Sequence, residues 1–321
     1  MTTPLIRSFN RSSWHRLVSI ALASAASMAI VTLPLSSTGA GAGTDSKLII
    51  AVGAENEYAN VIGQIGGQYV KVSSILSDPN TDPHTFEASP SVAEVISAAQ
   101  LIVQNGVGYD GFMNKIEAAS PNTKRKVIVV QDVLGLPTDT PNPHLWYSPK
   151  TMPAVASAVA KDLEKLDPSH ASYFRKNLST FDASLQRWLR SIAAFKAAYP
   201  GTPVAVTEPV ADYLLKAMGM RILTPFVFQA DIMNGVDPAP EDISLEEGFF
   251  TKHEVKVFCY NQQVVDSLTS TIKQTAISAK VPVVGVYETM PTPGYDYQSW
   301  MLAEVKAIEA AITHHRSTEK L

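Results

Sequence analysis

The chain contains a single cysteine, Cys259, among its 321 residues. One cysteine cannot form a disulfide within the chain. It lies far from the N-terminus, so no cysteine is available there for lipid attachment. Its neighbours, Val257, Phe258 and Tyr260, predict a buried strand in which the thiol packs as a small hydrophobic group. Stability must therefore come from the hydrophobic core.

Charge is also scarce. Asp, Glu, Lys and Arg make up 17% of the residues, compared with about a quarter in an average soluble domain. The net charge is −4 and no polybasic run occurs, which excludes the basic surface that nucleic-acid binding requires. The motifs His-Glu-x-x-His and Gly-x-Ser-x-Gly are absent as well, which disfavours a zinc peptidase and a serine hydrolase.

Only one long apolar run occurs, at residues 17–33. Three arginines precede it, and the small residues 36–42 follow it. This order is typical of a cleaved export signal, and the run is marginal for a spanning helix of about 20 residues. We therefore predict a signal peptide over residues 1–42 and a soluble periplasmic protein that is not a lipoprotein.

The remaining chain alternates short apolar strands with helical patterns, which predicts an α/β fold with parallel-rich sheets. We expect two lobes, over residues 43–168 and 201–321. The predicted strands are 47–53, 70–76, 101–106, 126–130, 203–208, 255–260 and 281–288. Residues 226–240 are polar and rich in turn formers, so a surface loop is expected there.

Residues 169–199 contain no proline or glycine, and large apolar side chains recur there at helical spacing. We predict one helix over 169–200 that links the two lobes. A helix of about 30 residues would be roughly 45 Å long. Two shorter helices with a kink are the alternative.

Two short motifs place a histidine directly after a proline. His84 lies in Asp-Pro-His-Thr-Phe-Glu (82–87), and His144 lies in Asn-Pro-His-Leu-Trp (142–146). Proline restricts its own backbone and that of the preceding residue, so each histidine is expected on a stiff loop. Two imidazoles held in this way suit a metal site. Asp82 could orient the imidazole or form only a local turn bond.

Two carboxylates, Glu208 and Glu288, follow predicted strands of the second lobe. Either could be only a helix cap or a surface charge. Together with His84 and His144 they form a set of two imidazoles and two carboxylates that suits a divalent transition ion. The ion would then lie between the lobes, with two ligands from each.

The two histidine motifs carry a family resemblance. Residues 82–91, the run Leu-Ile-Val-Gln-Asn-Gly (101–106), residues 142–150 and Leu-Asp-Pro (166–168) resemble the metal-binding solute receptors of zinc and manganese ABC importers, cluster A-I. The resemblance covers essentially the mature chain. It implies a receptor without catalytic activity, built from two lobes and a rigid linking helix.

The resemblance also implies a ligand set and partners. Glu208 falls at the family's third ligand position. The fourth is usually an aspartate; Glu288 occupies that position here, and Asp296 is the alternative. The cargo would be one divalent metal ion, with manganese favoured over zinc and iron as a third candidate. The partner would be an ABC permease at the inner membrane, and the receptor is expected to be a monomer.

Two alternatives from other classes stay open on the sequence. A secreted metal-dependent hydrolase could use the same residues to activate water at an open coordination position. A surface adhesin would show no role in metal uptake.

Overall fold

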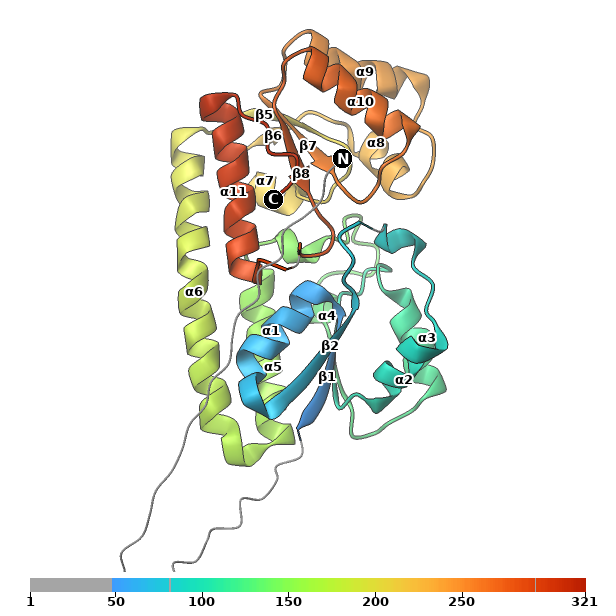
Figure 1. The fold of residues 1–321 in the computed structure, drawn as a ribbon, viewed down its shortest axis with the longest axis vertical. Coiled ribbons are helices and arrows are strands. Elements are labelled where there is room, and N and C mark those ends of the chain that lie inside the picture. Colours follow the sequence, from blue (N-terminus) through green and yellow to red (C-terminus); the bar gives the residue numbers. More distant parts are fainter. Residues whose placement is uncertain (1–47, 81, 292) are drawn as a thin grey trace, which may run out of the picture. The chain divides into compact units, whose positions relative to one another are not determined.

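The computed structural model describes residues 48–80, 82–291 and 293–321 (Figure 1). The predicted signal peptide, residues 1–42, lies outside this part. Among the residues described, no helix combines the length and the apolar character needed to cross a membrane. The fold is α/β with two parallel four-stranded sheets flanked by helices, as predicted.

The first sheet has strand order β2-β1-β3-β4, and all its strands are parallel. Its strands are β1 (Ile49–Glu55), β2 (Val70–Leu76), β3 (Leu101–Gln104) and β4 (Lys126–Val129). Alternate residues of β1 enter different core clusters: Ala51 packs with α1 (Asn56–Gly66) and α5 (Thr151–Leu166), whereas Val52 packs with α2 (Pro90–Ala98) and α3 (Gly111–Ala119). Helices on both faces explain why this strand is a continuous apolar run.

The second sheet repeats this arrangement with strand order β6-β5-β7-β8, again entirely parallel. Its strands are β5 (Pro203–Val206), β6 (Arg221–Ile222), β7 (Val257–Asn261) and β8 (Val283–Val286). Its helices are α7 (Asp212–Ala217), α9 (Pro240–Thr251), α10 (Ser267–Ser278) and α11 (Tyr297–His314). Cys259 is buried in β7, as predicted. In each sheet the strand order reverses beside the first strand, β1 or β5. In sheets of this kind, ligands bind outside the carboxyl ends of the strands at that point.

A single helix, α6 (Ala171–Ala198), links the two lobes. It has 28 residues and is about 42 Å long. It follows a short 3₁₀ turn, Pro168–His170, and contacts α1 and α5 of the first lobe and α11 of the second (Figure 1). Its buried side chains belong to a core cluster that includes residues of both sheets. The long helix is therefore confirmed, and the kinked alternative is wrong.

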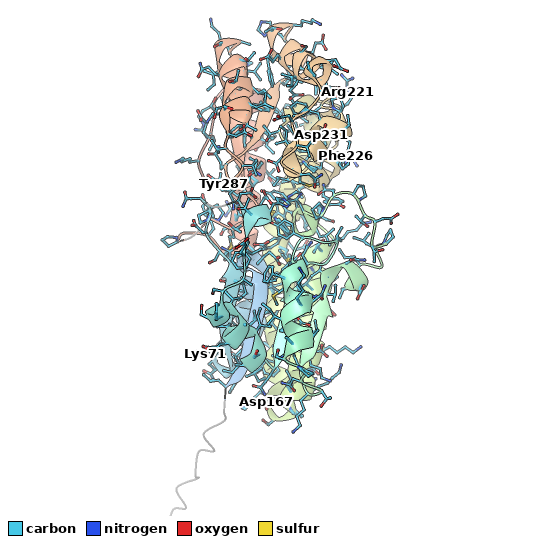
Figure 2. The ribbon with its side chains drawn as sticks, turned by 90° about the vertical axis from the view of Figure 1, so that its right-hand side faces the viewer. Lys71, Asp167, Arg221, Phe226, Asp231 and Tyr287 are labelled. Atoms are coloured by element: carbon cyan, nitrogen blue, oxygen red, sulfur yellow. The ribbon has the colours of Figure 1, made fainter. Side chains whose placement is uncertain are left out.

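The prediction of a surface loop over residues 226–240 is wrong. The structure has a helix there, α8 (Phe226–Met233), and α9 begins at Pro240. Phe228 and Ile232 are buried four residues apart on one face of α8. The intervening polar residues conceal this short period in the sequence. Figure 2 labels Phe226 and Asp231 on this helix, in the second lobe, whereas Lys71 and Asp167 lie at the far end of the first.

The last residues of the chain return to the second sheet. Thr318 pairs in parallel with Val284: its amide donates to the Val283 carbonyl at 2.8 Å, and its carbonyl accepts from the Gly285 amide at 2.9 Å. The amide of Leu321 donates to the Tyr287 hydroxyl at 3.2 Å. The tail therefore covers the exposed edge of β8, which leads directly to Glu288.

Substitution of Gly285 by alanine is expected to destabilise the protein by about 1–3 kcal/mol. A Cβ atom at this position would lie 2.0 Å from the carbonyl oxygen of Glu319, so the tail would have to leave the sheet edge. Urea unfolding checks the effect. Gly63→Ala is the matched control, because a Cβ there meets nothing within 4 Å inside α1, and we expect it to stabilise by up to about 1 kcal/mol. Equal effects of the two variants would contradict the role of the tail.

Candidate metal centre

Three of the four predicted ligands, His84, Glu208 and Glu288, follow the carboxyl ends of strands, whereas α4 (Val130–Val133) and a loop separate His144 from β4. His84 lies in a 3₁₀ turn, Pro83–Thr85, after β2, and His144 directly precedes a second one, Leu145–Tyr147. Glu208 and Glu288 each lie two residues beyond a strand of the second sheet, β5 and β8. The proline before each histidine keeps the preceding backbone extended, so the imidazoles project from short, stiff turns.

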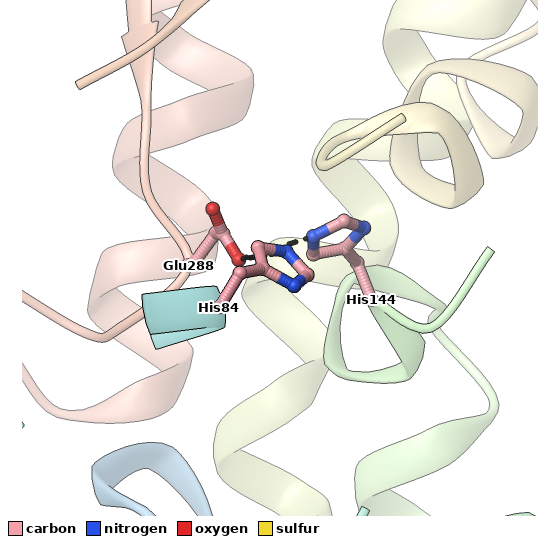
Figure 3. Close-up of side chains that lie close together, drawn as sticks. All are labelled: His84, His144 and Glu288. Atoms are coloured by element: carbon pink, nitrogen blue, oxygen red, sulfur yellow. Dashed lines mark hydrogen bonds and ion pairs between the residues drawn. The ribbon is translucent and has the colours of Figure 1, made fainter. Parts of the chain in front are cut away.

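The structure brings three of these four residues together. His84, His144 and Glu288 each offer a ligand atom within 4.8 Å of the others, and no other such group of His, Cys, Asp or Glu occurs in the described part of the chain. Oε2 of Glu288 lies 3.2 Å from Nε2 of His84 and 3.3 Å from Nε2 of His144 (Figure 3). The side chain of His84 is 24% exposed, while the other two are fully buried. The centre is therefore reached from its His84 side.

The orientation of His144 is set by Asn142. The amide Nδ2 of Asn142 donates to the carbonyl of Pro209 at 2.7 Å, so its Oδ1 must be the acceptor facing His144. That oxygen lies 2.9 Å from Nδ1 of His144, which therefore carries a proton and donates. Nε2 is then the ring nitrogen that faces Glu288, and it can bind an ion once its own proton is displaced. A ring protonated on Nδ1 alone is the tautomer that a metal ligand requires.

Glu208 lies beside the three-residue group but is not part of it. The amide Nδ2 of Asn261 donates to Oε1 of Glu208 at 3.0 Å and to Oε1 of Glu288 at 2.7 Å, so it bridges the two carboxyl groups. The second oxygen of Glu208, Oε2, is buried and accepts no hydrogen bond within the described structure. An oxygen with unused acceptor capacity next to the group is suited to bind a cation.

The electrostatics of the group favour a divalent cation. Burial alone would raise the pKa of Glu288, but hydrogen bonds from His144 and His84 outweigh it and lower that pKa. Burial lowers the pKa of the His144 imidazole, against the opposing effect of Glu288. Burial and the neighbouring Glu288 raise the pKa of Glu208 well above its ordinary value. A bound cation would relieve the repulsion between these two buried carboxylates.

Three residues at the centre were not assigned from the sequence. The Tyr109 hydroxyl donates to Oε2 of Glu288 at 2.9 Å, across 179 positions of sequence. Asn142 was part of a quoted motif, but its bond to His144 was not anticipated. Asn261 ends β7, a strand that is otherwise apolar, and its side chain is buried. A polar residue at the end of an apolar strand could have indicated its place at the centre.

Two further expectations concern aspartates. Asp296, the alternative fourth ligand, is the N-cap of α11, where its carboxylate accepts from the Ser299 amide at 2.8 Å. It is not among the three clustered residues. Asp82 accepts a hydrogen bond from the backbone amide of His84 at 2.8 Å. This is the local turn bond, and not a bond that orients the imidazole.

Comparison with known proteins gives one matching family and many relatives. Residues 52–311 match the profile of the family described as zinc-uptake complex component A, periplasmic. The manganese ABC transporter substrate-binding lipoprotein PsaA of Streptococcus anginosus is 22% identical over 264 residues, which are 77% of this chain and 83% of that protein. The iron ABC transporter substrate-binding lipoprotein MtsA of Streptococcus pyogenes is 26% identical over 223 residues, 65% of this chain and 70% of that one.

Solved structures share the fold. The crystal structure of ZnuA superposes with a TM-score of 0.65 at 22% sequence identity, and the match covers 82% of this chain and 98% of that one. This likeness confirms the two-lobed α/β architecture.

Proposed function

Since this chain belongs to the family of zinc-uptake complex component A, the metal-binding receptors of ABC importers, we propose that it binds its ion through His84, His144, Glu208 and Glu288. The family consists of transport receptors and not of enzymes, so the hydrolase alternative is wrong. The protein is an extracytoplasmic binding protein that associates with an ABC transporter. The observation that supports the ligand set most strongly is the convergence of His84, His144 and Glu288 at 3.2–3.3 Å.

The cargo is one divalent metal ion, and we propose manganese ahead of zinc, with iron third. Relatives are named for manganese and for iron, so membership in the family leaves the metal open. Two carboxylates beside two imidazoles make a harder donor set than three imidazoles would, and oxygen ligands suit manganese. Zinc binds mixed sites more tightly at equal geometry, so selection for manganese requires both carboxylates to contribute additional bonds. Elemental analysis after loading with equimolar manganese and zinc tests this order.

Replacement of His84 or Glu208 by alanine is expected to weaken binding of the preferred ion by about 100-fold or more, because each variant removes one of four direct ligands. Isothermal titration of each metal-free variant with that ion measures the affinity. His170→Ala is the matched histidine control, because His170 pairs with Asp167 on the surface, outside the group. Full affinity in Glu208→Ala would remove Glu208 from the ligand set and leave three protein ligands.

We propose that the lobes comprise residues 43–168 and 201–321, and that α6 restricts their relative motion. Contacts of α6 with α1, α5 and α11 tie helices of both lobes into one core cluster. Release of the ion would then depend on small shifts of the ligand turns. Crystals with and without metal are expected to show similar lobe positions; a large hinge rotation would contradict this.

We further propose that the mature protein is a soluble periplasmic monomer that delivers its ion to an inner-membrane permease. Its one cysteine, Cys259, is buried in β7 and so cannot carry a lipid. N-terminal sequencing of the exported protein is expected to show cleavage within residues 36–42. A mass increase from an attached lipid would contradict this part of the proposal.

A further inference from the structure

A cavity of about 490 Å³ opens onto the exposed side of His84. It is lined by the turn that carries Asp82 and His84, by residues 232–235 at the end of α8, and by residues 263–266 after β7. A divalent ion with six waters needs roughly 180 Å³ if each water takes about 30 Å³. The cavity therefore has room for the hydrated ion before it sheds its waters.

The charge around this cavity has one sign. Asp82 and Asp266 are the ionisable acids among its lining residues, and none of these described lining residues is a lysine or arginine. Asp82 is carried by the same turn as the exposed ligand His84.

Each aspartate also has a local structural role that explains its presence without any ion. Asp82 accepts from the His84 amide at 2.8 Å, and Asp266 accepts from the Thr269 amide at 2.7 Å as the N-cap of α10. Asparagine performs both of these roles nearly as well as aspartate. An asparagine variant therefore removes the charge and keeps the turn or the cap.

We propose that this cavity is the entry vestibule of the metal centre, in which Asp82 and Asp266 attract the hydrated cation and His84 is the first ligand to bind it. The proposal rests on the proposed metal centre. His144 and Glu288 are fully buried, so an ion arriving from solvent meets the exposed edge of His84 before it meets them. Like-signed carboxylates around a cleft raise the local concentration of a cation and its association rate.

The test is stopped-flow mixing of the metal-free full protein with manganese chloride alone. The fluorescence of Trp146 reports binding, because its ring centroid lies 5.4 Å from that of His144. In the double variant Asp82→Asn/Asp266→Asn we expect the association rate constant to fall about 3–10-fold at low ionic strength. The deficit should shrink to less than about twofold at 0.5 M salt, where charges are screened within a few ångström. The dissociation rate should stay unchanged.

The matched control is Glu241→Gln, which removes one exposed carboxylate at the start of α9, outside the cavity. It should associate at the wild-type rate. The vestibule is wrong if the double variant associates as fast as wild type, if Glu241→Gln slows association equally, or if the loss is entirely in dissociation. If the wild-type protein still binds one ion in those cases, only the vestibule is excluded and the proposed metal centre is retained. If the wild-type protein binds no ion, both the vestibule and the metal centre are excluded.

Discussion

Glu288→Gln is expected to weaken metal binding by about 100-fold or more. Oε2 of Glu288 is the atom on which His84, His144 and the Tyr109 hydroxyl converge. Glutamine keeps the size of the side chain but removes one of the two negative charges that the proposed ligand set offers a divalent ion. Its amide NH₂ can also turn toward the imidazoles and occupy the position of the ion. Isothermal titration with manganese and with zinc measures the loss.

The control for this experiment is Glu246→Gln. Glu246 is also a buried carboxyl group of the second lobe, but it bonds to Thr224 and is not among the clustered residues. The affinity of the Glu246→Gln variant for metal should stay within about twofold of wild type.

The affinity of Asn142→Ala should lie between those of Glu246→Gln and Glu288→Gln, with a loss of about 10–100-fold. This variant leaves the His144 ring without the bond that orients it but removes no ligand. Binding by Glu288→Gln within tenfold of wild type would exclude Glu288 as a ligand.

The candidate ligands could be proposed from the sequence because three of them follow strands whose apolar runs are easy to recognise, and three of the four, His84, His144 and Glu288, lie together in the structure. The proline before each histidine also indicated that these residues lie in turns. The parallel sheets then bring strand ends together at one edge, so residues far apart in sequence become neighbours. The same reasoning predicted α6, whose large apolar side chains repeat over seven turns without proline or glycine.

What the sequence did not predict was how the side chains meet. Tyr109 reaches Glu288 across the two lobes. Asn261, at the end of β7, bridges the carboxyl groups that follow β5 and β8, the strands on either side of it. No local pattern encodes such contacts, since they depend on how the lobes pack. The helix α8 was missed for a different reason: it has only 8 residues, and its buried positions span little more than one turn, too few for a period to be recognised.

The stability of the metal-free protein is expected to fall as the pH rises from about 5 to 8. Burial raises the pKa of Glu246 from 4.5 to about 8, and burial does the same for Glu57 and Glu304. Between these two values the folded protein keeps a proton that the unfolded chain releases, so each rise in pH favours unfolding. Each group should lower the free energy of unfolding by roughly 1 kcal/mol per pH unit in this interval. Urea unfolding at pH 5, 6, 7 and 8 in the presence of a chelator measures the slope.

Glu246→Gln isolates one of these protons. Oε1 of Glu246 accepts from the Thr224 hydroxyl at 3.2 Å, and the glutamine oxygen can accept the same bond. Glutamine therefore mimics the protonated carboxyl group but cannot titrate. The variant should match wild type near pH 5 and become more stable than wild type by a few kcal/mol at pH 8, since only the wild type must hold a proton or bury a charge there. Parallel pH profiles would show that Glu246 has the same affinity for protons in both states. Because Glu246 lies outside the metal centre, a shallower slope in the variant would identify burial itself, and not metal binding, as the source of the alkaline instability.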